Sequence, residues 1–226
     1  MSGRTTEPAE GARYRAKLSR YRSPEGAHEY HAEYERKLHR KLSDRRERRI
    51  YRRFFRAMGR PDVVLDLPAG AGRLYEFLAD RSGRVLEGDW SESMLALDRA
   101  EHAGAALGYV RCSGLAVPLR DGAVDATFSI RLSHHLPTQA EREAHLSELF
   151  RVTRGWVVVT WFSATSLKNV LRVLRRPLDR KPPKNVMRTS AVVALARSCG
   201  FERGATISLA PLGSGHVIGL FRRATI

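Results

Sequence analysis

VVLDLPAGAGR, residues 63–73, is the stretch of sequence that decides the fold. An apolar run ends in Asp66, and a turn with Gly70 and Gly72 leads into a predicted helix from Arg73. Glycines let a backbone approach a ligand closely, and a helix N-terminus offers free N–H groups. The stretch therefore predicts a ligand-binding turn between a strand and a helix, although an ordinary β–α turn can have the same pattern.

A second segment, VLEGDWSESML at residues 85–95, has a similar pattern of an apolar run, an acid and a predicted helix. Its apolar run ends in Asp89, and Ser91 is a predicted N-cap for the helix that follows. A carboxylate at the end of a second strand can accept hydrogen bonds from both hydroxyls of a ribose. The two segments together favour a nucleoside-containing ligand.

Short apolar runs alternate with helical patterns outward from these segments, which predicts an α/β doubly wound sheet. The predicted strands cover residues 63–67, 84–87, 109–111, 123–130 and 156–162, and the predicted helices between them cover 73–80, 92–102 and 139–152. Thr138 and Glu141 form a predicted capping box. Two further runs, 206–209 and 216–221, have no helix between them and predict a terminal hairpin.

Four motifs stand in register along this pattern: VLDLPAGAG (64–72), GDWSESML (88–95), SGLAVPLRDGAVD (113–125) and LSHHLP (132–137). In this order and spacing, the chain resembles class I S-adenosylmethionine-dependent methyltransferases. The resemblance is to the small-molecule type that includes the ubiquinone/menaquinone methyltransferases. It implies a Rossmann-like, seven-stranded sheet with a terminal antiparallel hairpin, and N-terminal helices that cover the acceptor pocket.

The resemblance also implies which residues bind the cofactor, S-adenosyl-L-methionine. They are Asp66, Ala69, Gly70, Gly72, Asp89, Trp90, Ser113, Gly114, Leu115 and Arg131. The glycine turn and Asp66 would surround the methionine end, Asp89 the ribose, and Trp90 with residues 113–115 the adenine.

Two positions depart from the family pattern. Pro68 stands where the family usually has its first glycine, and proline fixes φ but leaves a turn feasible. Ser113 stands where the family often has an acid, and its hydroxyl can still accept a hydrogen bond without charge assistance. A nicotinamide dehydrogenase fits less well, because Pro68 and Tyr75 occupy glycine positions of its fingerprint.

The acceptor side has a candidate catalytic residue, His135, whose imidazole could act as a general base near neutral pH. A packing or capping role for the histidine doublet is the alternative, since methyl transfer needs mainly alignment and desolvation. Candidate substrate-binding residues are Tyr30, Tyr34, His134 and Trp161. For the two tyrosines, packing of a helical aromatic stripe on the sheet is the alternative.

The charge of the chain is strongly basic and unevenly distributed. The 226 residues carry 40 Lys and Arg against 24 Asp and Glu, a net charge of +16. Residues 11–60 hold a net +11 and residues 163–190 a net +7, so the remainder is nearly neutral. In the resembled family, these two segments flank the acceptor pocket. An anionic or lipid-linked small acceptor is therefore expected, with a nucleic acid and peripheral membrane contact as further alternatives.

The chain organisation expected from these patterns has three parts: a disordered tail over 1–22, a basic helical cap over 23–60, and a methyltransferase domain over 61–226. A basic helical insertion occupies 163–190. Within the cap, Ser23 is expected to begin one helix, and Asp44 with Glu47 to restart a second. A basic amphipathic helix is expected over 166–176.

The expected function is that of an S-adenosylmethionine-dependent methyltransferase acting on an O, N or C nucleophile. The alternative is a catalytically degenerate fold that binds nucleic acid or a membrane surface through its basic face. Two cysteines and no signal-like N-terminus fit a cytoplasmic protein. No apolar run is long enough to span a bilayer, and no Cys/His spacing predicts a metal site.

Overall fold

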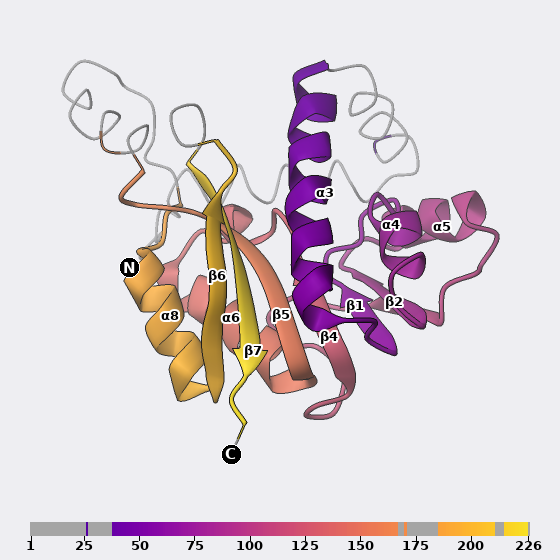
Figure 1. Cartoon of the computed structure of the whole chain (residues 1–226). Helices are drawn as coiled ribbons and strands as arrows, with labels where there is room; N and C mark the ends of the chain where they lie inside the picture. The colour runs from indigo at the N-terminus through magenta and orange to yellow at the C-terminus, as the bar shows by residue number, and fades with distance from the viewer. Residues whose placement is uncertain (1–25, 27–37, 167–169, 171–184, 211–214, 226) are drawn as a thin grey trace, which may run out of the picture.

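The computed structural model describes residues 26, 38–166, 170, 185–210 and 215–225. Its sheet has seven strands in the order β3-β2-β1-β4-β5-β7-β6 (Figure 1). The strands are β1 Val63–Asp66, β2 Arg84–Asp89, β3 Gly108–Arg111, β4 Val124–Ser129, β5 Thr153–Phe162, β6 Phe201–Ser208 and β7 His216–Arg223. The first five are parallel, and β7 runs antiparallel to both β5 and β6. The predicted Rossmann-like sheet with a terminal hairpin is confirmed.

Helices cover both faces of this sheet (Figure 1). They are α3 Leu38–Met58, α4 Tyr75–Ala79, α5 Glu92–Glu101, α6 Gln139–Val152 and α8 Thr189–Ser198, with a short 3₁₀ turn, η1, at Ser133–His135. One apolar cluster joins α3 and α4 to the sheet, and a second joins α6 and α8 to its other face. This layering leaves the carboxyl ends of β1, β2 and β4 at one edge, where a doubly wound sheet binds ligands.

Local capping explains where two of the helices begin. Ser91 accepts a hydrogen bond from the Met94 N–H at the start of α5. Thr138 and Glu141 form the predicted capping box at the start of α6. Both caps satisfy backbone donors that the first helical turn leaves without a partner. The predicted bounds of α6 are confirmed for this reason.

The expected helix break at Asp44 is wrong. A single helix, α3, runs through this position from Leu38 to Met58. Asp44 does not cap a new helix, because its carboxylate instead pairs with Arg48 one turn later and with Arg73 beyond the glycine turn. The sequence spacing favoured a capping role for Asp44, but in the folded chain its carboxylate forms ion pairs instead.

An apolar stripe on α3 packs the helix against the sheet. Tyr51, Phe54 and Phe55 are buried, and the rings of Tyr51 and Phe55 contact those of Phe77 and Phe128. Aromatic pairs of this kind add to the free energy gained from burying apolar area. These aromatic residues of the described part of the cap therefore belong to the core.

Several expectations fall outside the described residues. These are the tail over 1–22, the helix start at Ser23, the side chains of Tyr30 and Tyr34, and most of the amphipathic helix over 166–176. In the described part, β6 begins at Phe201 rather than at the expected residue 206. After the buried Phe201, the next residues, Glu202, Arg203 and Gly204, are exposed, so this part of β6 lacks the apolar run that marked the other strands.

Candidate functional site

The glycine turn after β1 is held from both sides by backbone hydrogen bonds. The Leu67 N–H donates to the Phe128 carbonyl of β4, and the Ala69 N–H donates to the Gly88 carbonyl of β2. Pro68 lies between them and follows a cis peptide bond. The turn therefore accommodates proline at the position where the family pattern usually has glycine.

Two glycines of this turn adopt left-handed backbone conformations that disfavour other residues. Gly70 has φ +64° and Gly72 has φ +70°. A Cβ built on Gly70 would meet no atom within 4 Å, so this backbone borders open space. A Cβ on Gly72 would overlap the Asp98 carboxylate and the His102 ring. Gly70 thus leaves room for a ligand, whereas Gly72 lets α5 pack closely against the turn.

Asp89 connects the turn to the end of β2. One of its carboxylate oxygens accepts from the Gly70 N–H at 2.9 Å, and the other accepts from the Ser91 N–H at 2.8 Å. The residue is 8% exposed. Each carboxylate oxygen can accept a further hydrogen bond, so Asp89 can bind a ligand hydroxyl while it holds the turn. Trp90, which follows it, is 42% exposed.

Buried carboxylates gather behind this edge of the sheet. Asp66, Glu87 and Asp98 are all inaccessible to solvent or nearly so. Glu87 and Asp98 share a side-chain hydrogen bond, whereas Asp66 Oδ1 has no hydrogen-bond partner among the described atoms. Burial raises the pKa of Asp66 and of Glu87 well above the ordinary value of each; the charge of Arg73 opposes this effect at Asp66, and neighbouring acids add to it at both residues. A positively charged ligand at this edge would favour the ionised form of these carboxyl groups.

Glu87→Gln is expected to flatten the pH dependence of stability. In the wild-type chain, the native state keeps a proton on Glu87 above pH 4.5, where the unfolded chain releases it. The free energy of unfolding should therefore fall as the pH rises from 4.5 through the raised pKa. Glutamine has the same shape but no titration, so denaturant unfolding at a series of pH values should show a shallower fall. The exposed Glu202→Gln variant is the control, and a slope unchanged by Glu87→Gln would contradict the expectation.

An ion-pair network joins α3 to the site, and sequence reasoning missed it. Glu47 is 1% exposed and pairs with Arg131 at 2.5 Å and with Arg73 at 3.3 Å. Asp44 also pairs with Arg73 at 2.5 Å. Arg131 follows β4 with φ +68°, and its N–H donates to the Thr160 hydroxyl. The buried Glu47 thus holds both Arg73, which follows the glycine turn, and Arg131, which lies in the segment after β4. The sequence offered no signal beyond two acids on a basic helix.

The residues expected near an adenine form a tight turn after β3. The Leu115 N–H donates to the Ser113 hydroxyl, and the Gly114 carbonyl lies 2.8 Å from His145 Nδ1 on α6. The other ring nitrogen of His145 lies 3.0 Å from the Ser129 hydroxyl. Burial lowers the pKa of His145 to about 4, so this imidazole is neutral at physiological pH. His145 was missed, although a histidine on the apolar face of a predicted helix could have indicated it.

The histidine doublet lies on η1 beside the ends of β5 and β7. The His134 ring is 4.1 Å from His135, 4.6 Å from Phe162 and 5.3 Å from His216, measured between ring centroids. Ser133 anchors the turn, because its hydroxyl donates to the Thr160 carbonyl. Thr160 therefore links this turn to Arg131, whose N–H bonds to its hydroxyl.

Trp161 is not part of this cluster of rings. It is 1% exposed within the apolar cluster under α6 and α8, where it packs near Phe221. Its role in substrate binding stays a prediction. Within the described part of the chain, no cluster of His, Cys, Asp or Glu is arranged to hold a metal ion.

The chain is similar in sequence and in fold to known methyltransferases. Residues 65–159 match the model of a methyltransferase domain family. Among solved structures, a magnesium protoporphyrin IX methyltransferase from Synechocystis with bound S-adenosylhomocysteine superposes with a TM-score of 0.69 at 16% identity, covering 83% of this chain and 88% of that one. A 1,6-didemethyltoxoflavin-N1-methyltransferase from Burkholderia thailandensis gives 0.65 at 16% identity, covering 100% and 94%. The chain thus has the fold of these solved methyltransferases, and residues 65–159 resemble the methyltransferase domain family.

Part of the chain is also similar in sequence to two methyltransferases of quinone biosynthesis. The ubiquinone/menaquinone biosynthesis C-methyltransferase UbiE of Xylella fastidiosa is 35% identical over 114 residues, which is 46% of this chain and 44% of the relative. The demethylmenaquinone methyltransferase of Thermus thermophilus is 34% identical over 96 residues, which is 41% and 42% of the two chains. The chain thus matches less than half the length of these relatives. The resemblance to class I methyltransferases of the small-molecule type is confirmed for the matched segment.

Proposed function

We propose that this chain is an S-adenosylmethionine-dependent methyltransferase that methylates an O, N or C nucleophile of a small molecule. The observation that carries the proposal is the edge formed by β1 and β2. There, Gly70 borders open space, the Asp66 Oδ1 atom has no partner among described atoms, and Asp89 keeps accepting capacity. A class I fold with cofactor-bound structural neighbours supports the same conclusion.

The residues at this edge fit S-adenosylmethionine in shape and charge. The Gly70 backbone and Asp66 would lie at its methionine portion, and Asp89 would accept the ribose hydroxyls. Residues 113–115 and Trp90 would border the adenine. When bound, the cofactor supplies an electrophilic methyl group on a positively charged sulfur. That positive charge would favour the ionised form of Asp66, and the ionised carboxylate would in turn stabilise the charge.

The chain itself contributes alignment and exclusion of water. Glu47 holds Arg73, which follows the glycine turn, and Arg131, which follows β4. The ring cluster of His134, His135, Phe162 and His216 lies at the ends of β5 and β7. An acceptor held there in line with the methyl group needs little further chemistry from the protein.

The acceptor we propose is anionic or lipid-linked. The relatives are named for ubiquinone and menaquinone biosynthesis, which favours a small-molecule acceptor. The two basic segments, 11–60 and 163–190, would steer an anion towards the site. Tyr30, Tyr34, His134 and Trp161 remain the proposed substrate residues. A cytoplasmic location is part of this proposal, and no described helix is long and apolar enough to cross a membrane.

Asp89→Asn is expected to weaken binding of S-adenosylhomocysteine about 10- to 100-fold, because charge-assisted hydrogen bonds to the ribose are lost. Calorimetric titration measures this directly. Asp80→Asn, at an exposed acid after α4, is the control and should bind like the wild-type chain. No binding by the wild-type chain at millimolar cofactor would refute the proposal. It would favour the alternative, a degenerate fold that binds nucleic acid or membrane.

His135→Ala is expected to lower methyl transfer more than His134→Ala does, if His135 removes a proton from the acceptor. The measurement is transfer of labelled methyl from the cofactor to candidate quinols, phenols and acidic metabolites. The His134 variant is the control, since its ring packs between His135 and Phe162. Small and equal losses would assign the doublet a packing role.

A further inference from the structure

The helix α3 lies over one face of the sheet (Figure 1), and its outer side consists almost entirely of arginine. Six exposed arginines lie there: Arg45, Arg46, Arg49, Arg52, Arg53 and Arg56. Because an α-helix completes a turn every ~3.6 residues, these positions occupy an arc of about 120°, opposite the buried Glu47 and Tyr51. Ala57 is the one other exposed residue among the described side chains of α3. We call the six residues the arginine face.

The arginine face has no acidic partner within the described part of the chain. None of its six guanidinium groups forms an ion pair with a described residue. The two acids of α3, Asp44 and Glu47, lie away from the face. They pair instead with Arg48, Arg73 and Arg131. The outer side of the helix is therefore a stretch of positive charge without compensation.

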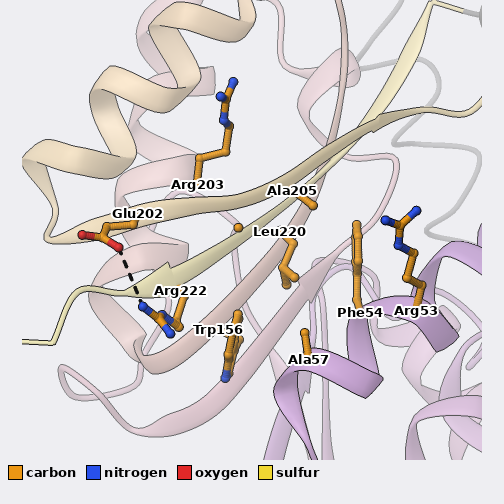
Figure 2. A pocket seen from close by; sticks show the side chains of 10 residues that line it. Arg53, Phe54, Ala57, Trp156, Glu202, Arg203, Ala205, Leu220 and Arg222 are labelled. Carbon is orange, nitrogen blue, oxygen red and sulfur yellow. Dashed lines mark ion pairs between the residues drawn. The ribbon is translucent and has the colours of Figure 1, made fainter.

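Exposed arginines on two strands do have acidic partners. Arg154 of β5 pairs with Asp125 at 2.7 Å. Arg222 of β7 has Glu202 of β6 at 3.8 Å, as the dashed line in Figure 2 marks. A preference of the chain for arginine over lysine therefore does not by itself explain a face without acids.

The like charges of the arginine face repel one another. Its members lie three or four residues apart along the helix, as Arg45, Arg49 and Arg52 do. Side chains at this spacing are neighbours, and like charges there destabilise a helix. The helix is held in place from its other side, where Figure 2 shows Phe54 turned towards Leu220. An anionic partner that extends along the face would relieve the repulsion.

The spacing of the charges suits a nucleic-acid backbone. From Arg45 to Arg56 the helix rises about 16 Å, so the face carries one positive charge per ~3.3 Å. One strand of B-form DNA carries a phosphate every ~3.4 Å. Planar guanidinium groups also bind phosphate oxygens through paired hydrogen bonds. The arginine face therefore matches a DNA strand in linear charge density as well as in sign.

The composition of the face disfavours other anionic partners. The exposed large apolar side chains of the described chain are Trp90, Leu107 and Val170, and none of them lies on α3. An interfacial membrane helix inserts apolar side chains into lipid, and a protein interface buries an apolar centre. Single-stranded nucleic acid stacks its bases on exposed aromatic rings. A duplex needs none of these features, because it presents phosphates along its outside.

We propose that the arginine face binds the phosphate backbone of double-stranded DNA without reading its sequence. The guanidinium groups would contact successive phosphates along one strand, and such contacts position a protein on DNA but do not specify a base. The face lies on the outer side of α3, whereas the glycine turn lies at the carboxyl ends of β1 and β2. This binding is therefore independent of the proposed methyl transfer.

The test is a titration of a short, fluorescently labelled DNA duplex of mixed sequence with the full chain, followed by anisotropy at several salt concentrations. We expect a dissociation constant in the micromolar range near physiological salt. The logarithm of the binding constant should fall with the logarithm of the salt concentration, with a slope of about −4 to −5. Saturating S-adenosylhomocysteine, added to fill the proposed cofactor site, should change neither value. No binding at low salt, or loss of binding with S-adenosylhomocysteine, would overturn the proposal.

A triple variant on α3 locates the contacts. Arg49→Gln/Arg53→Gln/Arg56→Gln should weaken duplex binding about 10- to 100-fold and make the salt slope shallower by about 2 to 3, since each phosphate contact contributes to that slope. Glutamine is also a good helix former, and its neutral side chain relieves the repulsion. The variant should therefore be at least as stable as the wild-type chain in denaturant unfolding. An unchanged salt slope would show that the face does not contact DNA.

A matched control removes the same charge elsewhere. Arg120→Gln/Arg197→Gln/Arg203→Gln changes three exposed arginines outside α3 and should bind the duplex almost as the wild-type chain does. Equal weakening by the two triple variants would show general attraction to a basic protein and would refute the proposal. Vesicles that contain phosphatidylglycerol give a second comparison. If the α3 variant lost vesicle binding but kept duplex binding, the face would belong to a membrane surface and the proposal would be wrong.

Discussion

Replacing Gly72 by alanine is expected to lower the free energy of unfolding by about 3 kcal/mol. Gly72 has φ +70°, which costs energy for any residue with a Cβ. The added methyl group would also overlap Asp98 and His102 of α5, so the helix would have to move away from the turn. Denaturant unfolding measures the loss.

Gly70→Ala provides the contrast within the same turn. Its φ of +64° is similar, but an added Cβ would enter open space, so a loss of only about 1 kcal/mol is expected. The same methyl group would occupy space proposed for the cofactor and should weaken its binding. Gly104→Ala is the control, because it has φ +69°, open surroundings and a place outside the turn. Equal stability losses for Gly70→Ala and Gly72→Ala would contradict the close packing of α5.

Glu47→Gln is expected to lower the free energy of unfolding by about 2 to 3 kcal/mol. The buried carboxylate compensates the charges of Arg73 and Arg131, and the neutral amide can accept from only one of them. This loss of unfolding free energy is at the lower end of the range expected when one partner of a buried ion pair is removed, because both arginines remain partly exposed. Thermal and denaturant unfolding measure it, and weaker cofactor binding should accompany it.

A double-mutant cycle of Glu47→Gln and Arg131→Gln isolates the pair from general destabilisation. A coupling energy of about 1 kcal/mol or more is expected between the two positions. The exposed Glu76→Gln variant on α4 is the control and should change stability little. Additive losses in the cycle would show that the ion pair does not stabilise the native state.

The strand–helix alternation could be predicted from the sequence because each signal is local. Apolar runs, glycines in a turn and the capping box at Thr138 depend only on neighbouring residues. The ion pairs of Glu47 could not be predicted, since they join residues 26 and 84 positions apart. Asp44 shows the same limit, because its spacing favoured a cap and the folded chain uses it to bind Arg48 and Arg73.

Some residues of the candidate site could also be predicted from the sequence, and others could not. Gly70, Gly72 and Asp89 follow from motifs, and in the structure Asp89 at the end of β2 accepts a hydrogen bond from the glycine turn. The position of His145 on the apolar face of a predicted helix indicated burial, but its contact with the Gly114 carbonyl depends on the packing of α6 against the segment after β3. The start of β6 was missed because its outer, charged residues lie at the edge of the sheet.

The attachment of α3 through Glu47 bears on how parts of this chain can be exchanged with those of a relative. A chimera that took its first 60 residues from another methyltransferase would receive a new helix over an unchanged glycine turn. Unless that helix carried an acid opposite Arg73 and Arg131, two partly buried cations would face each other without compensation. The unit that can be transplanted therefore includes the helix together with both arginines, although they are far apart in the sequence.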